Sequence, residues 1–183
     1  MMRDARILAW LLADPARADQ LSASQKEGVR RIAEAEGLLP ELEAVLDARP
    51  LSKLDMPDAV EGMVCDEAVA LLGQGSLEGG LRRLWHIHQL LSLGAKRPAF
   101  WQDLVALSQQ RRVTRYVSRA LRLSYHLFET PVDPYLAWQG QKADIFFLGR
   151  LLARDGQGRD RAYWLRGAFR ARAWWISQRP QAR

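Results

Sequence analysis

The chain has 183 residues, of which 48% are hydrophobic and 26% are charged. This composition allows a buried core and excludes wholesale disorder, and the length fits one domain rather than two large ones. The net charge of +6 is unevenly spread: residues 1–80 hold 8 Lys/Arg against 15 Asp/Glu, a balance of −7, whereas residues 81–183 hold 19 against 6, a balance of +13. We therefore expect an acidic N-terminal half (1–80) and a basic, arginine-rich half (81–183) within one integrated domain.

Two interpretations fit this asymmetry. The acidic half can dock on the basic half within the fold, or the basic half can face an external polyanion such as nucleic acid, a nucleotide phosphate or anionic lipid. Of the 19 cations in residues 81–183, 17 are arginine, which suits bidentate phosphate contacts but also follows from a GC-rich genome. Composition leaves both interpretations open.

Cysteine content and hydropathy indicate the compartment. The single cysteine, Cys65, cannot form an internal disulfide, and it lies in an apolar run where we expect a packed thiol. The first apolar stretch, residues 7–13, is too short for a signal peptide, and no run approaches the roughly 20 apolar residues of a membrane span. We therefore expect a cytoplasmic protein without a transmembrane segment.

Helix start and stop signals divide the acidic half. Asp4 caps a first helix that Pro15 closes, and Ser24 with Glu27 matches a capping box for a helix that ends at Gly37. The other elements expected in this half are, in chain order, a short helix over 41–47, a linker over 49–58 with two prolines, and a helix over 58–72.

Glycine and proline divide the basic half in the same way. Four glycines make the segment 73–80 a loop or hinge. The helices expected after it cover residues 81–93, 98–107, 113–128, 134–152 and 159–177. No window shows strand alternation bounded by hairpin turns, and no repeat has a fixed period. The sequence therefore predicts an all-α fold, a compact multi-helix bundle of eight or nine helices with no sheet.

Two of these helices are rich in arginine. The helix over 113–128 has one apolar side, and the opposite side carries Arg111, Arg112, Arg115, Arg119 and Arg122. In the last helix one side is expected to hold Trp164, Leu165, Ala168, Phe169, Ala171, Trp175 and Ile176, and another to hold Arg159, Arg166 and Arg170. Such a basic amphipathic helix can lie on an anionic membrane or on nucleic acid, or its tryptophans can pack on the body of the protein.

Residues for metal chemistry are scarce. The three histidines, His86, His88 and His126, and one cysteine cannot assemble the usual zinc sites. There is no phosphate-binding glycine loop ending in Lys-Ser/Thr, no Gly-x-Ser-x-Gly elbow and no Asp-x-Asp pair. We expect no metal site and no cofactor, and the sequence favours a non-catalytic protein without deciding the question.

One local pattern offers a catalytic alternative. Arg83, followed by four residues and then His88, resembles the Arg-x4-6-His motif of HEPN-type ribonucleases, and Arg82 also fits the spacing. The resemblance implies metal-independent attack by a 2′-hydroxyl, with imidazole moving the proton and guanidinium holding the phosphate. Arg119 and His126 satisfy the same spacing rule, so the motif has low specificity in this chain.

A wider resemblance covers about residues 60–175. The segments that carry it are Leu81-Arg-Arg-Leu-Trp-His-Ile-His-Gln-Leu-Leu91, Phe100-Trp-Gln-Asp-Leu-Val-Ala-Leu107 and the helix that ends in Leu127-Phe-Glu-Thr-Pro-Val132. They resemble the helical C-terminal part of the uncharacterised bacterial nucleotidyltransferase family, where the last pattern is Leu-Phe-Gly-Thr-Pro-Val-Pro.

The resemblance does not carry the activity. It implies a separate α/β core with Gly-Ser or Gly-Gly and a downstream Asp-x-Asp that binds metal and nucleotide, but the only Gly-Ser step here, Gly75-Ser76, has no aspartate in the following dozen residues. No catalytic residue can be transferred. The chain looks like a stand-alone helical or degenerate member whose transferase is lost or is supplied by another polypeptide.

These observations favour a bacterial accessory protein that binds a protein partner or an anionic ligand. The predicted binding residues are Arg111, Arg112, Arg115, Arg119, Arg122, Arg166 and Arg170. The alternatives are a HEPN-type ribonuclease using Arg83 and His88, and a degenerate member of the nucleotidyltransferase family.

Overall fold

The computed structural model describes residues 3–47, 59–73, 77, 79–133 and 143–178. Within these ranges the chain is helical, and the only β pairing is an isolated antiparallel bridge between Arg154 and Asp160. The elements are α1 (Arg3–Ala13), η1, a 3-10 helix (Pro15–Gln20), α2 (Ala23–Glu36), α3 (Leu39–Leu46), α4 (Val60–Gly73), α5 (Gly80–Gly94), α6 (Phe100–Gln110), α7 (Thr114–Phe128), α9 (Asp144–Leu151) and α10 (Tyr163–Ser177). The all-α prediction is confirmed.

No helix in the described ranges is long and apolar enough to cross a membrane. The predicted linker over 49–58 and the predicted helix start at Pro134 lie outside the described residues. The last helix begins at Tyr163 rather than at Arg159, because Asp155 folds the preceding residues into a loop by accepting the backbone N–H groups of Gln157 and Arg159.

The start of α2 corrects one sequence prediction. The N-cap is Ser22, not Ser24: the Ser22 hydroxyl accepts the Gln25 backbone N–H, and the Gln25 side chain accepts the Ser22 backbone N–H. Two overlapping capping-box patterns are present in this sequence. The earlier one prevails because it adds residues to the helix while Ser24 is still tolerated in the first turn. The predicted end at Gly37 is confirmed.

Both halves of the chain contribute to one hydrophobic core. Helix α4 from the acidic half packs against α5, α6 and α7 from the basic half, and α1 packs against α2, α3 and α7. Ion pairs also join the halves. Those between acids of residues 1–80 and arginines of residues 81–183 are Glu36–Arg154, Glu41–Arg82, Glu61–Arg97, Asp66–Arg111 and Glu67–Arg83. Part of the charge asymmetry is therefore neutralised inside the fold.

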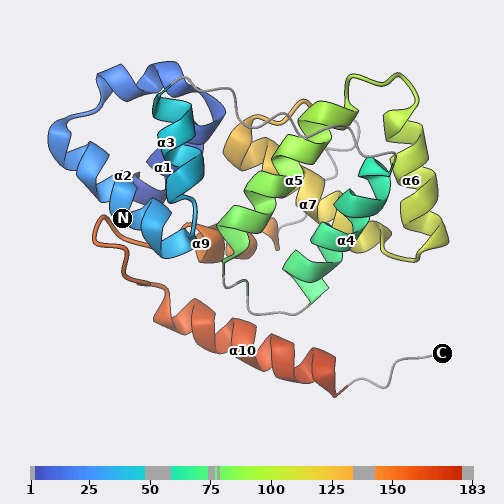
Figure 1. Ribbon diagram of the computed structural model, residues 1–183. Coiled ribbons are helices and arrows are strands. Elements are labelled where there is room, and N and C mark those ends of the chain that lie inside the picture. The colour runs from blue at the N-terminus through green and yellow to red at the C-terminus, as the bar shows by residue number, and fades with distance from the viewer. Residues whose placement is uncertain (1–2, 48–58, 74–76, 78, 134–142, 179–183) are drawn as a thin grey trace.

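Helix α10 lies along one side of the molecule and packs mainly against α9 (Figure 1). The rings of Phe147 and Phe169 join the two helices edge to face, with centroids 5.2 Å apart. Arg172 adds a hydrogen bond from Nη2 to the Leu72 carbonyl oxygen at 3.0 Å. Because its main contact is with one neighbour, α10 keeps much of its surface open to solvent.

Candidate functional site

The arginines predicted to form the surface of α7 are used in two different ways. Arg122 is only 3% exposed, and its Nε donates to Asp144 Oδ2 at 2.6 Å, while Arg119 Nε donates to Asp144 Oδ1 at 2.9 Å. Burial of Asp144 opposes its ionisation, but hydrogen bonds from Arg122 and Arg119 outweigh this and lower the pKa of the carboxyl. The prediction that Arg122 lies on the solvent side of its helix is therefore wrong, because Asp144 draws it into the contact between α7 and α9.

The other arginines of this group stay at the surface. Arg111 pairs with Asp66 at 3.0 Å, and both side chains are exposed. Arg115 stacks over the Tyr116 ring at 4.5 Å. Arg112 is exposed in the turn after α6, and the described residues offer it no ion-pair partner. Only scattered members of the predicted arginine surface are thus available to an anion.

The two arginines predicted on the last helix also differ. Arg166 is half-buried, and its Nη2 donates to Asp160 Oδ2 at 2.9 Å. Arg170 is exposed on α10 and makes no ion pair with any described residue. Of these two arginines, therefore, only Arg170 presents to solvent a charge that no described carboxylate neutralises.

The structure does not bring Arg83 and His88 together. Five residues along α5 turn the two side chains about 140° apart, and Arg83 instead pairs with Glu67 at 3.1 Å. His88 stacks on Trp85, with ring centroids 4.8 Å apart, and its Nδ1 lies 2.9 Å from Thr130 Oγ1. Burial lowers the pKa of His88 to about 4, so the ring is neutral at pH 7. This arrangement gives His88 a packing role, and the ribonuclease alternative stays a prediction.

Helix α10 exposes aromatic side chains, so its tryptophans do not all pack on the body, which is one of the two arrangements that the sequence allows. Leu165 and Phe169 are buried against the body, but Trp164, Trp174 and Trp175 are 69%, 65% and 53% exposed. The predicted single apolar side is therefore divided between two faces, and the side chain of Ile176 lies outside the described residues. The exposed face covers about 120° of the helix surface. We call it the tryptophan stripe, and it consists of Trp164, Gly167, Ala168, Ala171, Trp174 and Trp175.

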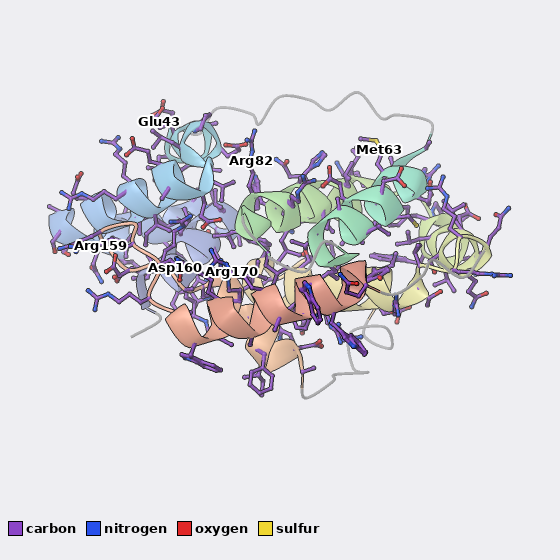
Figure 2. All side chains as sticks on the ribbon, turned by 90° about the horizontal axis from the view of Figure 1, so that it is seen from below. Glu43, Met63, Arg82, Arg159, Asp160 and Arg170 are labelled. Carbon is purple, nitrogen blue, oxygen red and sulfur yellow. The ribbon has the colours of Figure 1, made fainter. Side chains whose placement is uncertain are left out.

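The tryptophan stripe is notched in the middle. Between its tryptophans stand small residues, and a Cβ placed on Gly167 would meet no atom within 4 Å. On the neighbouring helix α9, Ile145 and Phe146 are also exposed. Figure 2, in which Arg170 is labelled, shows α10 lying across the near side of the molecule. Contiguous exposed apolar surface of this kind marks an interaction site in a folded protein.

The described residues contain no group of three or more His, Cys, Asp or Glu side chains that could hold a metal ion. Comparison of the chain with protein-family models, with curated proteins and with solved structures finds no match. The resemblances to ribonucleases and to nucleotidyltransferases therefore stay predictions. The physical character of the exposed surface is the guide to function.

Proposed function

We propose that the chain is a non-catalytic accessory protein that docks a helix of a partner protein on the tryptophan stripe of α10. The observation that carries the proposal is the exposure of Trp164, Trp174 and Trp175 on a helix whose other face is already packed. Tryptophan is enriched among the residues that dominate binding energy at protein interfaces. A helix that exposes three of them gains stability when a partner covers them.

The shape of the stripe defines the partner. Gly167, Ala168 and Ala171 are small residues between the tryptophans, with open space over Gly167, and a ridge of apolar side chains on another helix can pack closely against such small residues. Arg170 stands at the border of the stripe without an ion pair in the described part of the chain. We therefore infer a partner helix whose apolar ridge is flanked by carboxylates. A second copy of this chain fits less well, since it would place the arginines of two α10 helices side by side.

Two features support a relation to the nucleotidyltransferase family. Glu129, at the position where the family pattern has glycine, ends α7 with φ of 53°, a conformation that glycine favours. The hydrogen bond between His88 and Thr130 joins two of the matched segments. On this proposal the partner is a polypeptide that carries the α/β transferase core. Bacterial origin and a reducing cytoplasm belong to the same proposal. The buried free thiol of Cys65 supports the reducing compartment.

The charge and shape of the partner can be tested with two labelled amphipathic helical peptides of equal length. Both carry a leucine ridge, flanked by glutamates in one and by lysines in the other. Fluorescence anisotropy is expected to show binding of the glutamate peptide alone, and the double variant Trp164→Ala/Trp175→Ala is expected to lose it. Trp10→Ala, which removes an exposed tryptophan from α1, serves as the matched control and should bind normally. If neither peptide binds the intact chain, the proposal is wrong.

Other occupants of the stripe give different results. If the chain binds vesicles of anionic phospholipid but not the glutamate peptide, the stripe is a membrane-docking surface instead. Sedimentation velocity that shows a dimer, lost in the double tryptophan variant, would identify a second copy of the chain as the occupant. Each of these outcomes contradicts the proposed partner.

A further inference from the structure

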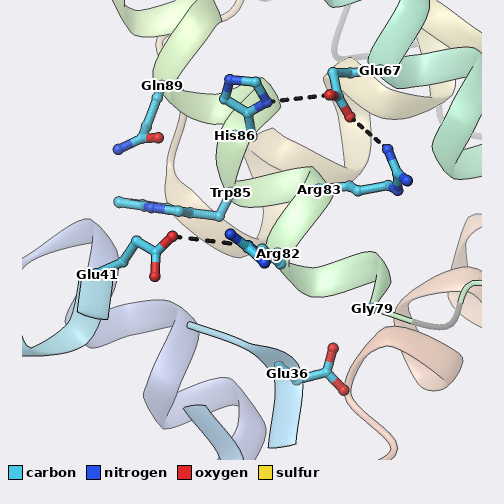
Figure 3. Close-up of a pocket in the computed structure, with 9 residues that line it drawn as sticks. All are labelled: Glu36, Glu41, Glu67, Gly79, Arg82, Arg83, Trp85, His86 and Gln89. Atoms are coloured by element: carbon cyan, nitrogen blue, oxygen red, sulfur yellow. Dashed lines mark hydrogen bonds and ion pairs between the residues drawn. The ribbon is translucent and has the colours of Figure 1, made fainter. Parts of the chain in front are cut away.

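Two adjoining pockets lie where α5 begins, away from the tryptophan stripe. The larger, of about 560 Å³, is lined by residues of α2, α3, α4 and α5, and the smaller, of about 200 Å³, by residues that include Arg150 and Asp160. The two pockets share Glu36 and Gly79. Figure 3 shows the larger pocket with Gly79 at the start of α5. A pocket of this size accommodates a small metabolite.

The N-terminus of α5 is open where the pockets meet. Its N-cap, Gly79, has φ of 62° and cannot cap the first amide groups itself, and no other described side chain is seen to cap them. A Cβ placed on Gly79 would meet no atom within 4 Å, so a ligand can approach the backbone closely. The Gly80 N–H already donates to the Leu77 carbonyl oxygen at 3.2 Å, so the next amide groups of the first turn and the helix dipole are what attract an anion to this position.

Buried polar atoms without partners provide independent evidence for a ligand. Trp85, which lines the larger pocket, is 3% exposed, and its Nε1 has no hydrogen-bond partner among the described residues. Arg150, which lines the smaller pocket, is 8% exposed, and its Nε also lacks a partner there. Glu41 Oε2 in the larger pocket is a third such atom. A buried polar group without a hydrogen bond destabilises the protein, and a ligand that supplied the missing hydrogen bond would be bound more tightly.

The charges on the walls limit the ligand to one phosphate. In the smaller pocket Arg150, Arg154 and Arg166 outnumber the carboxylates of Glu36 and Asp160, which they already bind. This excess of one positive charge lies next to the start of α5.

In the larger pocket the carboxylates outnumber the guanidinium groups, so they would repel a second phosphate: the acids are Glu36, Glu41 and Glu67, and the arginines are Arg82 and Arg83. Arg82 stands there 63% exposed, with its Nε 4.0 Å from Glu41 Oε1, so it can turn toward an anion. Figure 3 shows Arg82, Glu41 and Trp85 around this pocket.

We propose that the double pocket binds a small phosphate monoester with a hydroxylated body, such as a sugar phosphate. The phosphate lies at the N-terminus of α5, where Arg150 and Arg82 donate to it. The hydroxyl groups lie in the larger pocket, where a small turn of the Trp85 and Glu41 side chains lets Nε1 donate and Oε2 accept. This site is independent of the tryptophan stripe and of what docks there.

The charge of the ligand is tested at Gly79 in the full chain. Gly79→Asp places a carboxylate where the phosphate binds, and Gly79→Asn adds the same shape without charge, in a backbone conformation that both residues tolerate. Isothermal titration with ribose 5-phosphate is expected to show binding to the wild type and to Gly79→Asn, weakened at least about tenfold in Gly79→Asp. Arg112→Ala, an exposed arginine outside both pockets, should bind as the wild type does.

Three further ligands separate the possible sources of the phosphate. Inorganic phosphate and ribose alone should each bind more weakly than ribose 5-phosphate, because each occupies only one of the pockets. Vesicles containing phosphatidic acid should not bind through this site. The proposal is overturned if ribose 5-phosphate does not bind the wild type, or if Gly79→Asp and Gly79→Asn bind it with equal affinity. It is also overturned if inorganic phosphate binds as tightly as the ester, or if the chain binds vesicles and only Gly79→Asp abolishes that binding.

Discussion

Helices α7 and α10 are both 15 residues long and rich in arginine, yet the fold treats them differently. Helix α7 runs through the centre, packs against α1, α4, α5, α6 and α9, and buries Arg122 against Asp144. Helix α10 packs mainly against α9 and leaves three tryptophans exposed. The difference shows that arginine on one side of a helix does not establish a basic surface. Whether such an arginine is part of the packed structure or is free to bind a ligand depends on an acidic residue from another part of the chain.

The largest expected effect tests the structural role of the α7 arginines. Asp144→Ala leaves the buried guanidinium of Arg122 without its counter-charge, so the free energy of unfolding should fall by about 3–5 kcal/mol in urea denaturation. The control is Asp66→Ala, which removes the acid paired with exposed Arg111 and should cost less than about 1 kcal/mol. Equal losses in the two variants would contradict the contrast between the buried and the exposed pair.

The two faces of α10 should also respond differently. Phe169→Ala removes the ring that packs on Phe147, and we expect a loss of about 3 kcal/mol in the free energy of unfolding. Trp164→Ala, on the exposed face, should change it by no more than about 0.5 kcal/mol. Urea denaturation followed by circular dichroism measures both. A Trp164→Ala variant as unstable as Phe169→Ala would mean that the stripe is packed in solution.

A pH effect reports on the packing beside α7. The pKa of His88 is about 4 in the folded protein against an ordinary value of 6.5. Between these values the unfolded chain binds a proton that the folded protein does not, so acidification destabilises the fold through this group by up to about 1.4 kcal/mol per pH unit. In His88→Asn this contribution is absent. Denaturation of both proteins at pH 7, 6 and 5 should show the stability difference between them shrinking as the pH falls, and a constant difference would contradict the burial of His88.

The smallest effect concerns the notch of the stripe. Gly167→Ala reduces the conformational entropy of the unfolded chain and meets no neighbour, so the protein should gain about 0.5–1 kcal/mol in thermal denaturation. A loss of stability would show that another part of the molecule covers Gly167.

Local signals predicted the helices well because caps and breaks act over a few residues. Gly37 ends α2 as expected, and the helix boundaries within the described residues agree to within a few positions. The capping box of α2 lies two residues before the predicted one because two copies of the pattern overlap in the sequence. The 3-10 helix η1 was missed, although Asp14, whose carboxylate accepts the Ala16 N–H, precedes its first residue.

The candidate site was harder to predict because it depends on tertiary contacts. Arg122 and Asp144 are 22 residues apart in the sequence, and no local sequence pattern predicts that they pair. The tryptophan stripe had a partial signal in the sequence, since Leu165 and Phe169 already form one apolar row and Trp164 with Trp175 forms a second. Which row packs on the body depends on the position of α9, and only the structure provides it.

The docking role of the stripe is tested most directly by Gly167→Leu. This substitution fills the notch while it adds apolar surface and favours the helix. If a partner helix packs into the notch, anisotropy measurements should show the affinity for the glutamate-flanked peptide falling at least about tenfold. Unchanged or tighter binding would contradict the account, because it would mean that apolar area alone, and not close packing against small residues, attracts the partner.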